Sequence, residues 1–364
     1  SGPLRAKVSH RSLLHQRDQR ACVCCAPQPH AAMLRRLVLR SQQTDVAAAI
    51  RSLAVERVAP VPALDSPTAV RVRVKAAALN FFDLLMFVGK YQHKPSFPLV
   101  PAVECAGVVM EVGAGVRELA VHSRVYVWLP TGGATCEEII VDASQCQLLP
   151  APLSFEEGAG FNVGYMTAYH GLVHRGSLKS GETLLVTGAG GGMGVAAVQL
   201  GLVLGATVIA AASSDEKLAL LKQLGAHHTV NYRTSDLRDE VARITDGKFV
   251  DCVYEPVGGD VFKQCVRCMA GNGRLLVIGF ASGTIPTIPM NLPLIKGFSI
   301  VGVRSGFQLM QEPHLAIGMY KQLHEWATTK GLKPYVGITR DVEDCADAFT
   351  AIHEGRVVGK AVIT

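Results

Sequence analysis

The sequence predicts a two-domain α/β protein, in which a β-rich first domain is followed by a doubly wound parallel sheet. Two observations carry this prediction. Short β-type runs broken by glycine and proline fill residues 33–150, and apolar strands alternate with helical patterns from residue 154 onward. The chain has 364 residues, enough for two domains, and its 49% hydrophobic residues against 18% charged residues provide the apolar surface for two cores.

The first domain is predicted from runs whose composition is typical of strands. These runs lie at 34–39, 70–74, 106–112, 124–128 and 136–141. Near its end the chain is expected to return to this domain through a helix and a final strand, at 345–353 and 361–363. We therefore place the first domain at 33–162, completed by 304–364.

The second domain, placed at 163–303, is predicted from alternating strands and helices. The strands are expected at 183–187, 207–211, 229–232, 250–254, 274–278 and 298–303, with helices at 195–204, 215–224, 237–245 and 261–269. Alternation of this kind requires right-handed crossovers, and these give a parallel sheet covered by helices on both faces.

A glycine-rich loop follows the first of these strands and leads directly into a helix. The loop spells TGAGGGMG over 187–194, so that alanine replaces the first glycine of the dinucleotide-binding GxGxxG pattern. Backbone N–H groups at a helix start attract a pyrophosphate, and missing side chains let it approach. A purely structural turn is the alternative. In this context the loop favours a Rossmann dinucleotide site, whose predicted contacts are Ala189, Gly191, Gly192, Met193 and Gly194.

The residues after the next strand bear on the choice between NADPH and NADH. A site selective for NADH places an acidic residue there for the ribose 2′-hydroxyl, whereas this sequence has Ser213 and Ser214. Lys217 is placed to meet a 2′-phosphate, and Tyr232 closes the following strand. NADPH is therefore favoured. If Glu216 turned inward instead of lying in the first turn of the helix, NADH would be selected.

The positive charge of the chain is concentrated at its start. The formal net charge is +6, of which residues 1–32 carry +4. If residues 33–364 bound RNA or DNA, they would be expected to carry a larger excess of basic residues, so no nucleic-acid partner is expected. The uncharged stretch 183–214 contains seven glycines, which divide it into strand, loop, helix and strand, so no membrane span is expected either.

Residues 1–32 are expected to form a disordered N-terminal extension, because they lack helical or strand periodicity. Ten cysteines in 364 residues are too sparse for a disulfide scaffold, which favours a reducing compartment. We predict a cytoplasmic protein. The basic, acid-poor tail loosely resembles a transit peptide, and on that alternative the protein is mitochondrial.

With the loop in hand, the body from residue 33 to 364 resembles the medium-chain dehydrogenase/reductase superfamily, specifically its zinc-free quinone oxidoreductase branch, which includes zeta-crystallin. The resemblance implies a GroES-like catalytic domain with an inserted Rossmann domain. It is carried by ALNFFD at 78–83, GKY at 89–91, PAVECAG at 101–107, DCVYEPVGG at 251–259 and GFASG at 279–283.

The same resemblance implies that both zinc sites of related alcohol dehydrogenases are missing. Their catalytic ligand positions correspond to Asn80 and Val103, neither of which is a competent ligand, and the four-cysteine loop of the structural site is absent from the sequence. Glu104 is then expected to have a structural role. We predict no metal.

Without a Lewis acid, direct hydride transfer to an electron-poor acceptor is the chemistry that remains. The resemblance implies that Asn80 and Tyr91 line the nicotinamide and acceptor pocket and that Thr167 faces the cofactor. Their plainer roles are a loop-capping amide for Asn80 and a packed ring for Tyr91. Three further residues are placed near the cofactor on the same basis: Val257, Phe280 and Lys360.

The predicted activity is an NADPH-dependent, zinc-independent quinone reductase, with ortho-quinones favoured. One alternative keeps the fold and reduces C=C bonds of α,β-unsaturated carbonyls or enoyl-CoA thioesters. A second is a non-catalytic role, either binding NADPH and RNA or serving as a bulk protein like a lens crystallin. A homodimer is expected, because the strand at 298–303 resembles the edge strand that pairs across the two-fold axis of this superfamily.

Overall fold

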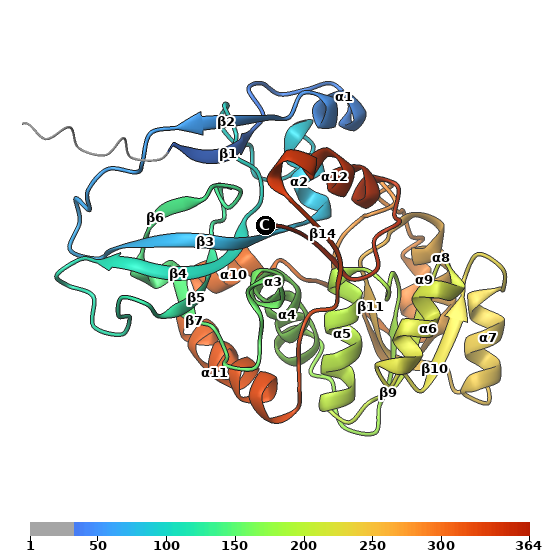
Figure 1. The fold of residues 1–364 in the computed structure, drawn as a ribbon. Helices are drawn as coiled ribbons and strands as arrows, with labels where there is room; N and C mark the ends of the chain where they lie inside the picture. The colour runs from blue at the N-terminus through green and yellow to red at the C-terminus, as the bar shows by residue number, and fades with distance from the viewer. Residues whose placement is uncertain (1–32) are drawn as a thin grey trace, which may run out of the picture. The chain divides into compact units, whose positions relative to one another are not determined.

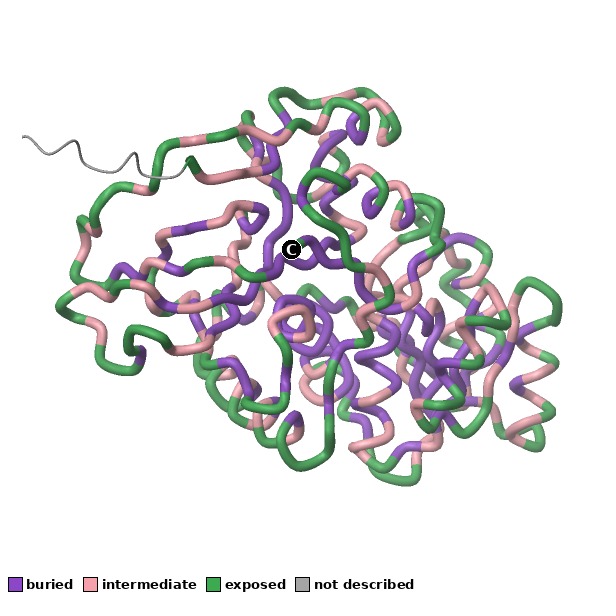
Figure 2. The backbone as a smooth tube through the Cα atoms, in the orientation of Figure 1, coloured by how far each residue is buried: buried purple, intermediate pink, exposed green. Residues whose placement is uncertain are grey.

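The computed structural model describes residues 33–364, which fold around three β-sheets (Figure 1). The disorder predicted for residues 1–32 concerns a segment outside this range. Buried residues gather in the parallel sheet and in the helices that pack beside it (Figure 2). Within the described range, no helix combines the length and the apolarity needed to cross a membrane.

Six parallel strands form the sheet of the second half, in the order β10-β9-β8-β11-β12-β13. The strands are β8 (Thr183–Val186), β9 (Thr207–Ala212), β10 (His228–Asn231), β11 (Val250–Glu255), β12 (Met269–Val277) and β13 (Ser299–Gly302). The connecting helices are α5 (Gly192–Val203), α6 (Asp215–Gln223), α7 (Leu237–Ile244), α8 (Gly259–Cys268) and α9 (Asn291–Lys296).

Both faces of this sheet are covered, as side chains along β8 illustrate. Leu184 and Val186 pack in the core that contains α5, while Leu185 between them packs in the core that contains α7 and α8. This alternation follows from the two-residue period of a strand, and it makes the strand apolar throughout. The predicted doubly wound fold is therefore confirmed. Strand β13 lies at the sheet edge, and its pairing with a second copy stays a prediction.

Seven strands form the other large sheet, in the order β14-β15-β3-β4-β5-β7 with β6 paired to β3. They are β3 (Ala69–Leu79), β4 (Glu104–Val112), β5 (Arg124–Trp128), β6 (Glu138–Asp142), β7 (Cys146–Leu148), β14 (Val336–Arg340) and β15 (Lys360–Ile363). A separate two-stranded sheet pairs β1 (Leu34–Val38) with β2 (Ala54–Val58). The seven-stranded sheet is the β-rich part of the predicted fold class.

Strand β15 inserts beside β3, although almost the whole described chain separates them. Val362 pairs with Ala78 and Ile363 with Ala77 in an antiparallel register. Alanines on β3 leave room for the helices that pack on both faces of the sheet, and Ala77 and Ala78 are at most 2% exposed. The last strand is therefore an interior strand of this sheet.

Helices α3 (Phe155–Ala159) and α4 (Phe161–Tyr169) lie between the two large sheets (Figure 1). They share one core with residues of β3, β4 and β5 on one side and of β8 and α5 on the other. The remaining helices are α1 (Val46–Arg51), α2 (Phe81–Phe87), α10 (Ser305–Gln311), α11 (Pro313–Thr329) and α12 (Cys345–His353), and a π-helical turn at His170–Arg175 extends α4.

The prediction that the helix after the glycine loop begins at residue 195 is wrong by one turn. Helix α5 starts at Gly192, and Gly191 occupies the N-cap position. Glycine has a poor helix propensity, and for this reason the sequence predicted these residues to lie in the loop. At a helix start, however, a residue without a side chain leaves the backbone N–H groups open to a ligand.

Two fully buried tyrosines differ in whether the hydroxyl is paired. The Tyr165 hydroxyl donates to Gln199 Oε1 at 2.8 Å, whereas the Tyr254 hydroxyl has no partner among the described residues. Both side chains are at most 1% exposed. An unpaired buried polar group costs stability, while a paired one contributes to it.

We expect Tyr254→Phe to raise the free energy of unfolding by about 1 kcal/mol, because it removes an unpaired buried hydroxyl and keeps the ring. The matched change Tyr165→Phe is expected to lower it by about 1 kcal/mol. Denaturant unfolding of the three proteins measures both values. Destabilisation of the same size in both variants would mean that the Tyr254 hydroxyl has a partner.

Candidate active site

A buried cluster of three polar side chains joins the starts of β4 and β15 to the end of β3. Lys360 Nζ donates to Glu104 Oε1 at 2.6 Å and to Asn80 Oδ1 at 2.8 Å, and Asn80 Nδ2 donates to Glu104 Oε1 at 2.9 Å. The second carboxylate oxygen of Glu104 accepts from the Val163 backbone N–H at 2.7 Å, which ties the cluster to α4. Glu104 is 0% and Lys360 5% exposed.

This cluster uses both polar ends of the Asn80 amide within the protein. A buried carboxylate is tolerated only when charge and hydrogen bonds compensate its lost hydration, and here Lys360, Asn80 and Val163 all contribute. The Asn80 amide nitrogen keeps a second N–H and the amide oxygen a second lone pair beyond these bonds. These bonds hold the Asn80 amide in place, and its contact with substrate stays a prediction.

Asp83 lies in the first turn of α2 and holds the backbone of Asn80. Its Oδ2 accepts from the Asn80 backbone N–H at 2.7 Å, while Oδ1 has no partner among the described residues. Burial raises the pKa of the Asp83 carboxyl to about 7, against the opposing effects of the Asn80 backbone hydrogen bond and the nearby Lys360 charge. This acid therefore titrates near neutral pH.

Tyr91 packs flat against a neighbouring aromatic ring. Its ring centroid is 5.1 Å from that of Phe82, with an angle of 18° between the planes. Burial raises the pKa of the Tyr91 hydroxyl, Asp83 raises it further, and Arg304 lowers it. Tyr91 is thus a protonated hydroxyl at neutral pH, and its ring lies within electrostatic range of Asp83 and Arg304.

The glycine loop packs so closely on the start of its helix that a side chain at Gly194 would not fit. A Cβ atom on Gly194 would lie 2.4 Å from Ala189 Cα and from the Gly188 carbonyl oxygen, which is closer than backbone atoms permit. The Gly191 carbonyl oxygen accepts from the Val195 N–H at 2.8 Å, so the helix is already formed at this point. The loop therefore fits the pyrophosphate of a dinucleotide at the start of α5.

The segment before β15 packs directly on this loop. The Gly359 N–H donates to the Gly190 carbonyl oxygen at 2.7 Å, and Gly359 forms an isolated bridge with Gly191. The stem of Lys360 fills the space beside Gly192, where a Cβ atom would lie 2.4 Å from Lys360 Cδ. The structure thereby brings the predicted cofactor residue Lys360 to the glycine loop, as well as to Asn80.

Lys217 crosses the other side of the same loop. Its stem lies over Gly190, where a Cβ atom would approach within 2.6 Å, and its Nζ donates to the Gly355 carbonyl oxygen at 2.6 Å. Burial lowers the pKa of Lys217, and the charge of Arg233 lowers it further. Lys217 and Arg233 therefore share one region next to the predicted pyrophosphate site.

Ser213 and Tyr232 meet at the ends of β9 and β10. Burial raises the pKa of the Tyr232 hydroxyl, and a hydrogen bond with Ser213 opposes this effect. Ser214 occupies the N-cap position of α6, but its side chain makes no capping hydrogen bond. Glu216 is exposed on α6, so the inward orientation that would favour NADH is not the one seen.

The remaining predicted cofactor residues lie in two further groups. Val257 and Phe280 lie just after the ends of β11 and β12. A Cβ atom on Gly188 would contact the Val257 side chain, and a Cβ atom on Gly258 would contact the Phe280 ring. Thr167, on α4, shares a 2.8 Å hydrogen bond with the hydroxyl of Ser305. Met193 packs against the core of the seven-stranded sheet.

The donor set near Asn80 does not fit a zinc ion. The ammonium group of Lys360 stands 2.6 Å from Glu104 and satisfies the carboxylate that a cation would otherwise balance. Across residues 33–364, no group of three or more histidine, cysteine, aspartate or glutamate side chains could hold a metal ion. Zinc independence of catalysis stays a prediction.

Two protein-family models match the chain, one over part of the first domain and one over part of the parallel sheet region. The "Alcohol dehydrogenase GroES-like domain" matches residues 66–179, and the "Zinc-binding dehydrogenase" family matches residues 192–324. A quinone oxidoreductase-like protein 2 homolog of Nematostella vectensis is 40% identical over 296 residues, which cover 81% of each chain. The chain belongs to the medium-chain dehydrogenase/reductase superfamily. It is an oxidoreductase.

Solved structures of superfamily members have the same fold. The Escherichia coli quinone oxidoreductase complexed with NADPH superposes with a TM-score of 0.79 at 25% identity, over 90% of this chain and 99% of that one. The CurK enoyl reductase gives a TM-score of 0.80 at 25% identity, over 91% of this chain and 99% of that one. Together with the glycine loop, these relatives establish a nicotinamide cofactor for this superfamily member.

Sequence reasoning missed two residues that the structure places at this site. Arg233 follows Tyr232 directly, so a cation one residue beyond the end of a predicted strand was a usable signal. Ser305 lies 138 residues from its partner Thr167, and no local pattern joins them. The pairing of Glu104 with Lys360, 256 residues apart, was equally invisible in the sequence.

We expect the free energy of unfolding to fall as the pH rises from about 4 to about 7, because of Asp83. Its pKa is about 7 in the folded protein, against an ordinary value of 3.8, so the folded state binds this proton more tightly than the unfolded state. The stabilisation is complete at low pH and is lost as the pH passes the folded value, by at most about 1.4 kcal/mol per pH unit.

Denaturant unfolding of the wild type and of Asp83→Asn across this range measures the effect. The asparagine side chain cannot ionise, so the difference between the two proteins should change with pH in the stated direction. A constant difference from about pH 4 to about pH 8 would contradict the assignment.

Proposed function

We propose that this oxidoreductase is an NADPH-dependent quinone reductase that transfers hydride directly, without zinc. The observation that carries the proposal is the buried cluster of Glu104, Asn80 and Lys360. Because the carboxylate is already neutralised by a lysine, the site offers no metal Lewis acid, and the acceptor itself must be electron-poor. Quinones meet this requirement, and close relatives carry the name quinone oxidoreductase-like protein 2.

Bound NADPH supplies the hydride, and the chain supplies position and polarity. The glycine loop and the start of α5 would hold the pyrophosphate, while Lys217, Arg233, Ser213 and Tyr232 would surround a 2′-phosphate. One hydride and one proton convert a quinone to a hydroquinone, so the reaction also needs a hydrogen-bond donor for the developing oxyanion.

Tyr91 is the residue we assign to that task. Its hydroxyl keeps its proton at neutral pH because burial raises its pKa, and its ring is fixed by Phe82. A rigid donor needs little reorganisation when charge develops on the acceptor oxygen. The flat surface of the two rings also suits a planar acceptor.

The acceptor class can be tested by following NADPH absorbance with ortho-quinones, para-quinones, enones and enoyl-CoA thioesters. We expect kcat/KM for quinones to exceed that for enones and thioesters by at least about tenfold, with no loss after treatment with a chelator. Preference for thioesters would replace the quinone assignment by C=C reduction, which the likeness to the CurK enoyl reductase supports as the second candidate.

The cofactor preference can be tested with Lys217→Ala. We expect the Kd of NADPH to rise by about tenfold or more and that of NADH by less than about threefold, because only NADPH carries the 2′-phosphate. Titration of both cofactors measures the two values, and Lys222→Ala on the exposed side of the same helix is the control. Lys217 also holds the Gly355 carbonyl, so an equal loss for both cofactors would assign it to loop structure alone.

A further inference from the structure

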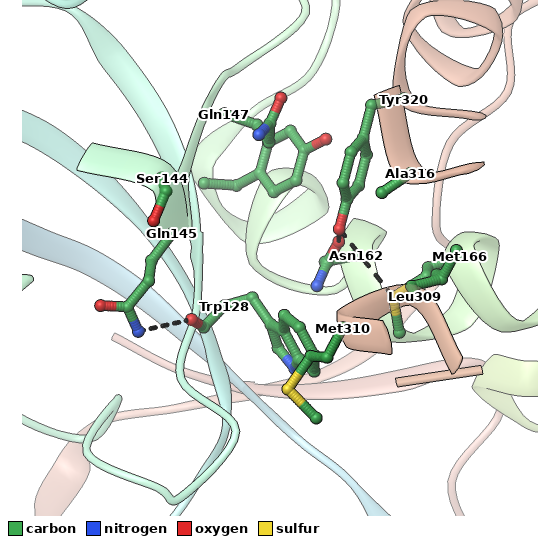
Figure 3. A pocket seen from close by; sticks show the side chains of 11 residues that line it. Trp128, Ser144, Gln145, Gln147, Asn162, Met166, Leu309, Met310, Ala316 and Tyr320 are labelled. Atoms are coloured by element: carbon green, nitrogen blue, oxygen red, sulfur yellow. Dashed lines mark hydrogen bonds between the residues drawn. The ribbon is translucent and has the colours of Figure 1, made fainter. Parts of the chain in front are cut away.

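A pocket of about 120 Å³ lies between α4, α10, α11 and the edge of the seven-stranded sheet at β5 and β7. The proposed hydride transfer uses none of the side chains that line it (Figure 3). Its size is comparable with the cavity of about 150 Å³ that holds a benzene ring in an engineered protein. Its principal lining residues are Trp128, Gln145, Asn162, Met166, Met310 and Tyr320.

One polar atom in this pocket lacks a partner. Asn162 is 2% exposed, and its Oδ1 accepts from the Tyr320 hydroxyl at 2.9 Å. Its Nδ2 has no hydrogen-bond partner among the described residues. In Figure 3 this nitrogen points toward Trp128 and Met310. A buried amide donor without a partner is costly, so a hydrogen-bond acceptor entering the pocket would remove a penalty.

The chemistry of the walls limits what can enter. Every side chain that lines the pocket is uncharged, so a carboxylate or phosphate would lose its hydration without compensation. Trp128 and Tyr320 provide aromatic surface, and Met166 and Met310 provide polarisable thioethers that adapt to a ring. These walls fit a neutral, ring-sized group that carries an oxygen acceptor.

The pocket lies on helices that also carry two residues of the candidate active site. Met166 directly precedes Thr167 on α4, and Met310 lies on the helix that begins with Ser305, whose hydroxyl bonds to Thr167. The Trp128 ring packs on Gly306, where a Cβ atom would lie 3.2 Å from it. The pocket therefore lies on the two helices, α4 and α10, that the hydrogen bond between Thr167 and Ser305 joins.

We propose that this pocket binds a neutral, ring-sized substituent of the acceptor, whose carbonyl or ether oxygen accepts a hydrogen bond from Asn162 Nδ2. The proposal rests on the proposed function and makes it more specific: the preferred acceptors carry such a group next to the reacting ring. Acceptors with a charged substituent are disfavoured, because the walls offer no counter-charge. A water molecule bonded to Asn162 is the competing occupant.

Binding of small probes to the full chain, with and without NADP⁺, tests the pocket without any turnover. Acetophenone has a neutral ring with a carbonyl, ethylbenzene lacks the acceptor, and benzoate adds a charge. We expect ligand-detected NMR to give acetophenone an affinity about tenfold above ethylbenzene and benzoate. Equal binding of acetophenone and benzoate, or no binding of acetophenone, would overturn the proposal in favour of a water-filled pocket.

Two variants locate the site of binding. Asn162→Leu is expected to weaken acetophenone about tenfold while leaving ethylbenzene within about twofold, and Ala316→Leu is expected to fill the pocket and weaken both. Gln322→Leu, a half-buried amide on α11 that does not line the pocket, is the matched control and should change neither. Unchanged acetophenone affinity in Ala316→Leu overturns the proposal, even if Asn162→Leu does not fold.

Turnover then separates this proposal from the proposed function. Asn162→Leu should lower kcat/KM about tenfold for a 1,4-benzoquinone that carries an aryl ketone, and by less than about twofold for unsubstituted 1,4-benzoquinone. If neither quinone oxidises NADPH, the proposed function fails, while the probe measurements still decide the pocket. If both quinones lose activity equally, Asn162 does not select the substituent and the proposal fails.

Discussion

The buried ion pair between Glu104 and Lys360 is the interaction on which the arrangement of the candidate site depends. It joins β4 to β15, and through Val163 it joins both strands to the helix layer between the sheets. Removing either partner would leave an uncompensated charge in the interior, which costs far more than the pair contributes. The same pair fixes the Asn80 amide and aligns the segment that packs on the glycine loop. One electrostatic constraint thus sets the positions of both the Asn80 amide and the segment that contacts the glycine loop.

The parallel sheet could be predicted from the sequence because its signals are local. Strands and helices alternate at short range along the chain, and the glycine loop indicates the predicted position of the cofactor. Helix α11 was not predicted, although Pro313 at its first position was a usable start signal. The start of α5 was placed too late, because helix propensity disfavours the glycines that ligand access requires. Local rules therefore work where packing and function agree with propensity, and they fail where function overrides it.

The candidate site was predictable only in part, because much of it is built from pairs that are distant in sequence. Lys360 meets Asn80 across 280 positions, and Ser305 meets Thr167 across 138. The family resemblance identified Lys360 and Thr167 as site residues, but it did not identify the residues they pair with. Asn162 had no sequence signal at all, since a polar residue in an apolar helix is usually just paired in the core. Its unpaired nitrogen became visible only when the walls around it were known.

The insertion of β15 between β14 and β3 has a consequence for how the protein is made. A ribosome delivers β3 long before β15, so the first sheet lacks an interior strand while the entire parallel-sheet region is being synthesised. N-terminal domains usually fold first. In this chain the first sheet cannot be completed before the parallel-sheet region has been synthesised. The strands of the parallel sheet are consecutive in the chain, whereas the edge of β3 at residues 77–79 stays unpaired until β15 is made. Until then, this short edge presents backbone groups that can pair with another strand.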